Sequence, residues 1–168
     1  MTKIYRYIDL PIALTSSNHL RMLLVADDNF LTGLYFVGRK HVPILSSDYH
    51  EQQNSSIFDQ TYQELIEYVN GARREFTIAY RFTGTNFQEK VWFAISTIPY
   101  GRVIGYKNIA DLIFVPKAVR AVANAIARNA LSIIVPCHRV IGTDGKLTGY
   151  AGGLEIKKKL LELEKDYS

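Results

Sequence analysis

Hydrophobic and polar positions alternate through the first part of the chain, a pattern that is typical of β-strands with one buried face. It runs through residues 3–8, 20–25 and 31–37, and the turn-forming residues 27–29 separate the last two segments. Consecutive strands usually pair as neighbours in a sheet. The pattern therefore predicts an antiparallel meander.

The period then changes to that of a helix. Apolar residues recur every three or four positions over residues 58–69, and the pattern stops at an Asn-Gly pair. A last strand is expected near residues 76–81. A helix packed on a sheet in this order predicts a small α+β unit, which we expect to span residues 1–83.

A second unit, residues 84–168, begins where the sequence becomes helical. Thr85 and Gln88 have the spacing of a capping box, in which each side chain binds the backbone N–H of the other residue. The helix that follows must end before Pro99, because proline disfavours helical geometry in the residue before it. Its buried stripe is formed by apolar residues at helical spacing: Phe87, Val91 and Ile95.

Two further helices are predicted close together. The first runs from about Tyr106 to Phe114, and the second carries Pro116 in its first turn, where a missing N–H costs nothing. Two short helices joined by a tight break favour a helix-turn-helix. Arginines and small residues on the second helix would let it approach a phosphate backbone closely, although alanine-rich helices are more often only tightly packed. The residues of this face are Arg120, Ala121, Asn124 and Arg128.

The chain of 168 residues carries a formal net charge of +4, which is unevenly distributed. Residues 1–100 hold 9 Lys and Arg against 10 Asp and Glu, whereas residues 101–168 hold 11 against 6. A basic C-terminal part attracts polyanions such as nucleic acid. The alternative is a solvated helix face, because part of the excess lies in the terminal helix. The lysines there are Lys157, Lys158, Lys159 and Lys165.

The composition excludes several classes of protein. One cysteine cannot form an internal disulfide, and the chain shows neither a long apolar span nor a signal-peptide pattern. We therefore expect a protein of a reducing compartment, the cytoplasm, with no membrane segment. His19, His41 and His50 have no cysteine partners and no regular spacing, so no metal site is expected.

The single cysteine, Cys137, follows the apolar run 131–135, which we predict to be a strand, and it precedes His138 and Arg139. An imidazole and a guanidinium beside a thiol favour a nucleophile. A lone cysteine is otherwise most often a small buried hydrophobic residue. Without its neighbours, Cys137 would be interpreted as structural.

Six blocks in the second half of the chain together resemble the O6-alkylguanine-DNA alkyltransferases, also called methylated-DNA-protein-cysteine methyltransferases. They are residues 87–92, 99–101, 105–106, 120–122, 134–141 and 147–153, of which the Pro-Cys-His-Arg sequence at 136–139 is the most specific. The resemblance implies an N-terminal ribonuclease-H-like α/β domain and a C-terminal helical, winged-helix-like DNA-binding domain. It also implies the bacterial type of the family, a monomer without zinc or another cofactor.

The resemblance implies that Cys137 is a nucleophile that reacts once per protein molecule. Its thiolate would take the alkyl group irreversibly from O6 of guanine in double-stranded DNA, with His138 as the base. Adjacent residues of an extended segment point to opposite sides, so a bridging water is expected between the two. The resemblance makes Glu164 the acid that orients His138, whereas sequence alone predicts a helix-surface carboxylate. Asn129 would brace the active-site loop, or cap a helix, or both.

The resemblance also implies how DNA is bound. The second helix of the helix-turn-helix would enter the minor groove, and Arg120 would fill the space left by the rotated nucleotide. Tyr106 would press on a phosphate and donate a hydrogen bond to guanine; a buried core tyrosine is the alternative. The base pocket would be formed by a short set of residues: Val140, Tyr150, Ala151 and Gly152.

Two positions depart from the family pattern, because Ala123 and Ala130 stand where a glycine and a proline are usual. Neither removes a reacting group, so we expect effects on DNA affinity or stability. Two rival functions stay open from the residues. One is a binding-only damage sensor or helix-turn-helix regulator on the same fold, which would lack the cysteine. The other is a thiol hydrolase on an unrelated fold, which would not explain Arg120 and Tyr106.

Overall fold

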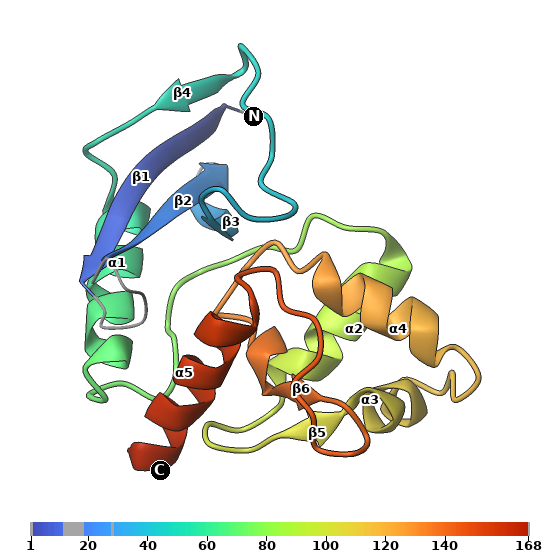
Figure 1. The fold of residues 1–168 in the computed structure, drawn as a ribbon. Coiled ribbons are helices and arrows are strands. Elements are labelled where there is room, and N and C mark those ends of the chain that lie inside the picture. The colour runs from blue at the N-terminus through green and yellow to red at the C-terminus, as the bar shows by residue number, and fades with distance from the viewer. Residues whose placement is uncertain (1, 12–18, 28, 168) are drawn as a thin grey trace. The chain divides into compact units, whose positions relative to one another are not determined.

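The chain folds as a mixed α+β protein that divides into two compact units, Met1–Arg81 and Phe82–Ser168 (Figure 1). A computed structural model describes residues 2–11, 19–27 and 29–167. The division lies close to the boundary expected after residue 83. Among the residues described, no helix has the length and apolar character needed to span a bilayer.

The first unit is built on one sheet whose strand order is β3-β2-β1-β4. Strand β1 (Lys3–Pro11) pairs antiparallel with β2 (His19–Asp27), and β2 pairs antiparallel with β3 (Phe30–Phe36). The predicted meander is therefore confirmed. A fourth strand, β4 (Tyr49–Glu51), runs parallel to β1. It escaped the sequence analysis because three residues are too few to show a period.

Helix α1 (Ser56–Val69) packs on this sheet as predicted, with Phe58 and Leu65 fully buried. The strand expected over residues 76–81 was wrong, because the segment makes only one bridge to the sheet, between Tyr80 and Leu31. A side chain takes over part of the backbone bonding there, since the buried Glu64 carboxylate accepts the N–H of Thr77 at 2.7 Å. Such a bond satisfies the backbone without a neighbouring strand.

The second unit begins with helix α2 (Asn86–Ser96), which has the predicted capping box of Thr85 and Gln88. Helix α3 (Tyr106–Leu112) and helix α4 (Val119–Ala127) follow, and they pack on each other and on α2 as the expected helix-turn-helix (Figure 1). Trp92 of α2 donates its indole N–H to the carbonyl of Ala125 at 2.8 Å. This bond fixes α2 against the back of α4.

Helix α4 begins three residues later than the sequence indicated, because Pro116 lies in the preceding turn and not in the helix. The face of α4 is as expected: Arg120, Asn124 and Arg128 are exposed, and Val122 is buried. The basic face is therefore open to a partner.

A short parallel pairing brings two distant segments together. Strand β5 (Ile104–Gly105) leads directly into α3, and β6 (Val140–Ile141) directly follows residues 137–139. The pairing of Ile104 with Val140 therefore places the start of α3 beside the cysteine segment. The last helix, α5 (Leu154–Asp166), packs on the same segment (Figure 1).

Helix α3 ends in a left-handed residue that is not glycine. Phe114 has φ 63° and is 86% exposed. The N–H of Val115 bonds to the carbonyl of Ala110 at 2.8 Å, and that of Phe114 to Asp111 at 3.0 Å. These bonds form a Schellman motif, whose left-handed position glycine usually fills because a Cβ atom is strained there.

We expect Phe114→Gly to raise the free energy of unfolding by about 0.5–1 kcal/mol, because it relieves this strain and removes little buried area. Urea denaturation measures the change. Phe114→Ala is the control, since it removes the ring but keeps a Cβ at the strained position. Equal stability of the two variants would contradict the assignment of the strain to this turn.

Candidate active site

Asn129 organises the segment that leads to the cysteine. Its side chain is buried, its Oδ1 accepts the N–H of Leu131 at 3.0 Å, and its Nδ2 donates to the carbonyl of Val135 at 2.9 Å. The strand predicted over residues 131–135 was wrong, because the segment is a turn with a single bridge position at Leu131. The amide of Asn129 supplies the hydrogen bonds that a partner strand would give.

The turn carries backbone strain at Ile133, which is buried and has φ 70°. A left-handed conformation is a genuine outlier for a β-branched residue and costs on the order of 1–3 kcal/mol. The surrounding contacts must hold it in place. Strain of this kind is concentrated at functional sites.

Cys137 opens a single 3₁₀ turn, Cys137–Arg139, and is only 5% exposed. Burial raises the pKa of its thiol, while a hydrogen bond from Asn129 Nδ2 to Sγ at 3.2 Å and the charge of Lys157 act in the opposite direction. The thiol therefore needs a base to ionise near neutral pH. The extended geometry expected at Cys137 and His138 was wrong, since the two residues lie in a tight turn, and the water expected between them stays a prediction.

The Glu164 carboxylate lies at the centre of a buried polar cluster. It is fully buried, so the prediction of a surface carboxylate was wrong. His138 Nε2 lies 2.7 Å from its Oε1, the Arg139 guanidinium donates to both oxygens at 2.9 Å, and the N–H of Gly101 donates to Oε2 at 3.1 Å. Helix α5, the cysteine turn and the loop after α2 thus meet at one carboxylate.

The cluster fixes the charge states of its members. Burial alone would raise the pKa of Glu164, but the hydrogen bond from His138 and the hydrogen bonds and charge of Arg139 outweigh burial and lower this pKa to about 2. Burial lowers the pKa of His138 despite the carboxylate beside it. His138 is therefore neutral and able to accept a proton near neutral pH, and Glu164 is ionised and able to stabilise the imidazolium that results.

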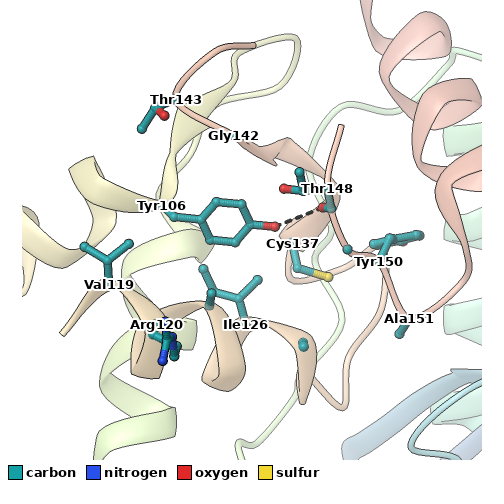
Figure 2. A pocket seen from close by; sticks show the side chains of 13 residues that line it. Tyr106, Val119, Arg120, Ile126, Cys137, Gly142, Thr143, Thr148, Tyr150 and Ala151 are labelled. Atoms are coloured by element: carbon teal, nitrogen blue, oxygen red, sulfur yellow. Dashed lines mark hydrogen bonds between the residues drawn. The ribbon is translucent and has the colours of Figure 1, made fainter. Parts of the chain in front are cut away.

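A cavity of about 630 Å³ opens beside the thiol. Figure 2 shows Cys137 and the ring of Tyr106 facing into it, with the Tyr106 hydroxyl donating to the carbonyl of Thr148 at 3.0 Å. Arg120 lines the cavity from α4, on the exposed side. The remaining lining comes mostly from small and apolar residues: Val119, Ala123, Ile126, Ala127, Gly142, Thr143, Gly149, Tyr150 and Ala151.

The structure brings most of the candidate residues together, but not all of them at the cavity. His138, Glu164 and Asn129 lie buried behind the thiol, and Val140 and Gly152 are buried without lining the space. The other residues of the α4 face line a separate hollow of about 250 Å³ next to the start of α2. These residues are Ala121, Asn124 and Arg128.

The sequence analysis missed two site residues, Arg139 and Lys157. Arg139 was noted only as a guanidinium beside the thiol, and Lys157 was interpreted as part of a basic region that attracts polyanions or, alternatively, as part of a solvated helix face. The structure buries Lys157 completely. A signal existed, since Lys157, Leu160 and Glu164 recur at the i, i+3, i+7 spacing of one buried helix face.

The fold and the cavity define a mixed α+β protein with a helix-turn-helix beside a buried thiol. Residues 86–166 match the model of the DNA-binding domain of 6-O-methylguanine DNA methyltransferase. The methylated-DNA–protein-cysteine methyltransferase of Mycobacterium tuberculosis is 43% identical over 96% of this chain and 92% of its own. The inducible enzyme of that name from Bacillus subtilis is 43% identical over 86% of this chain and 88% of its own.

A solved structure supports the same assignment. The crystal structure of M. tuberculosis OGT in complex with DNA is similar with a TM-score of 0.86 and 39% identity, and the match covers 98% of this chain and 94% of that one. The chain belongs to the methylated-DNA–protein-cysteine methyltransferase family.

We expect the free energy of unfolding to decrease as the solution becomes acidic, over the pH range in which Glu164 takes up a proton. Because its folded pKa of about 2 is below the ordinary value of 4.5, its contribution is complete above about pH 4.5 and is lost as the pH falls toward 2. The loss is on the order of 3 kcal/mol. Urea denaturation at several pH values should show that the free energy of unfolding depends less steeply on acid pH in Glu164→Gln than in the wild-type protein.

Glu162→Gln is the matched control for this test. Glu162 lies on the same helix with an exposed side chain that pairs with Lys158 at 3.7 Å. Its removal should leave the acid dependence of stability unchanged. A Glu164→Gln variant with the wild-type pH dependence would show that another group causes the acid loss.

Proposed function

We propose that this protein reverses alkylation of guanine O6 in DNA by accepting the alkyl group on Cys137, once per molecule. The observation that carries the proposal is the placement of the thiol at the wall of the cavity, with the neutral His138 and ionised Glu164 behind it. The membership of the chain in the family supports the same chemistry.

The reaction balances as a displacement at the alkyl carbon. The thiol proton passes to His138, the sulfur forms a bond to the carbon, and the bond from carbon to O6 breaks. The electron pair of the broken bond stays on the guanine, and a hydrogen bond from Tyr106 offsets its negative charge. The guanine then takes up one proton from solvent and the imidazolium of His138 gives one back to solvent, so the thiol proton is accounted for. The product is a thioether, which water does not hydrolyse, so the protein is consumed.

Glu164 acts through His138. Once the imidazole has taken the thiol proton, its positive charge lies 2.7 Å from an ionised carboxylate in a buried site. Charge pairing is strong there because the local dielectric is low. Arg139 keeps the carboxylate in place and ionised before the reaction begins. Asn129 holds the thiol itself through the bond to Sγ.

Binding requires a flipped nucleotide, because O6 lies inside the base stack of a duplex. Arg120, exposed at the cavity, is placed to fill the space that the nucleotide leaves. Ala121, Asn124 and Arg128 on the same helix would lie along the DNA, and the small side chains of α4 favour close approach in the minor groove.

The cavity suits a purine. Its volume fits a base, Tyr150 supplies an apolar wall, and the backbone of Val140 and Ala151 would bind the polar edge of the guanine. Gly152 would let the chain approach the ligand closely.

We assign the second unit to a winged-helix-like DNA-binding domain and the first to a ribonuclease-H-like domain, and we propose that the protein acts as a monomer. A binding-only sensor or regulator would need no thiol at the cavity.

Incubation with duplex DNA that contains O6-methylguanine should raise the intact mass of the protein by one methylene group, on the peptide with Cys137. Mass spectrometry measures both. Cys137→Ser should abolish the gain, because a hydroxyl is a far weaker nucleophile. Repeated demethylation of DNA without a change in protein mass would disprove the stoichiometric mechanism.

Arg120→Ala should slow reaction with duplex DNA by about tenfold or more while the reaction with free O6-benzylguanine changes little, because only the duplex needs flipping. Single-turnover rates measure both. Arg128→Ala is the comparison: it should weaken DNA binding and its salt dependence but leave the rate at saturating DNA intact. Equal losses of Arg120→Ala on both substrates would rule out the flipping role.

A further inference from the structure

Lys157 is a buried cation whose place in the site goes beyond the chemistry described above. It is fully buried, and its Nζ donates to the carbonyls of Val140 at 2.6 Å, Thr148 at 2.8 Å and Gly149 at 3.3 Å. A buried ammonium is costly unless its charge is compensated. These three acceptors are neutral carbonyl dipoles, so they solvate the charge without cancelling it.

The three carbonyls belong to two segments that are separate in the chain. Val140 follows the cysteine turn directly, whereas Thr148 and Gly149 lie in the loop that lines the cavity opposite α4. One ammonium thus ties the cysteine segment to the loop. Three rotatable N–H donors on a flexible stem suit this cross-link.

The carbonyl of Thr148 is shared between two donors, Lys157 and the hydroxyl of Tyr106 at 3.0 Å (Figure 2). In the proposed reaction that hydroxyl turns to the guanine and leaves the carbonyl. Lys157 remains bonded to the same oxygen, so the carbonyl is not left without a donor. The lysine therefore lowers the cost of releasing Tyr106 to the substrate.

The charge of Lys157 also acts on the thiol. It favours the thiolate of Cys137, and the thiolate in turn opposes the effect of burial on the lysine. Burial lowers the pKa of Lys157 to about 8. The other groups that face this charge are His138, whose pKa it helps to lower, and the ring of Tyr106, 6.0 Å from Nζ.

We propose that Lys157 is a positioning residue for alkyl transfer: its buried ammonium ties the cysteine segment to the loop at Thr148 and Gly149, frees the Tyr106 hydroxyl for the substrate and favours the reactive thiolate. The inference rests on the proposed function. It requires the lysine to be charged during the reaction, as the three hydrogen bonds do, because an uncharged amine has only two N–H donors. The packing of the stem alone would not require the charge.

Single-turnover rates of the full chain with free O6-benzylguanine and with O6-methylguanine duplex, from about pH 6 to about pH 9.5, test the proposal. Rising pH ionises Cys137 and raises the rate, but above about pH 8 it removes the charge of Lys157 and lowers the rate. The wild-type rate should therefore decline at alkaline pH. Lys157→Arg should lack this decline, because arginine does not deprotonate.

Lys157→Met keeps the length of the stem and removes the charge. It should react about tenfold more slowly than wild type with both substrates near pH 7, and its thiol should titrate at higher pH in an alkylation assay with iodoacetamide. Lys158→Met is the matched control, since Lys158 is the next residue of α5 and its side chain is 67% exposed. It should react at the wild-type rate.

Two results would overturn the inference: a folded Lys157→Met variant within about twofold of the wild-type rate, or a folded Lys157→Arg variant that is inactive or declines above pH 8 as wild type does. If Lys157→Met does not fold, as judged by thermal denaturation, the alkaline profile of Lys157→Arg decides. Absence of alkyl transfer in wild type would instead refute the proposed function, so the two failures are distinguishable.

Discussion

The interaction on which the site depends is the buried contact of Glu164 with His138 and Arg139. An ionised carboxylate away from water is stable only when cations and N–H donors surround it, and loss of one partner from such a cluster costs about 3–5 kcal/mol. Here the donors come from the cysteine turn and from the loop at Gly101. The carboxylate therefore fixes where the turn lies, and with it the direction in which Cys137 faces the cavity.

The sequence predicted those parts of the fold that show a period. The meander, α1 and the capped start of α2 follow from alternation, helical spacing and a capping box. The two predicted strands that do not form fail for a shared reason. At residues 76–81 Glu64, and at residues 131–135 Asn129, bond to the backbone in place of a strand. An apolar run does not reveal which polar side chain elsewhere will take its N–H and carbonyl groups.

The residues of the site also differ in how far the sequence predicted them. The thiol and its histidine are neighbours in the chain, so the motif predicts them directly. Glu164 was identified only through the family resemblance, and Lys157 was not identified at all. Both lie on the terminal helix, where a charged residue is usually solvated. The phase of α5 carried the information: the buried stripe through Leu160 includes both charges. Helical spacing identifies which face is buried, and a charge on that face is an exception that indicates function.

The two buried charges of α5 are compensated in different ways, and the difference suits a nucleophilic thiol. Glu164 meets a guanidinium, so its negative charge is largely cancelled before it can oppose ionisation of Cys137. Lys157 donates its hydrogen bonds to neutral carbonyls, so its positive charge still acts on the sulfur. Burial keeps His138 neutral and able to accept a proton. Helix α5 supplies the carboxylate that stabilises the resulting imidazolium and the positive charge that acts on the thiol. Because the thioether ends the reaction, the site has no need to regenerate its thiol, which is compatible with a strained and buried turn.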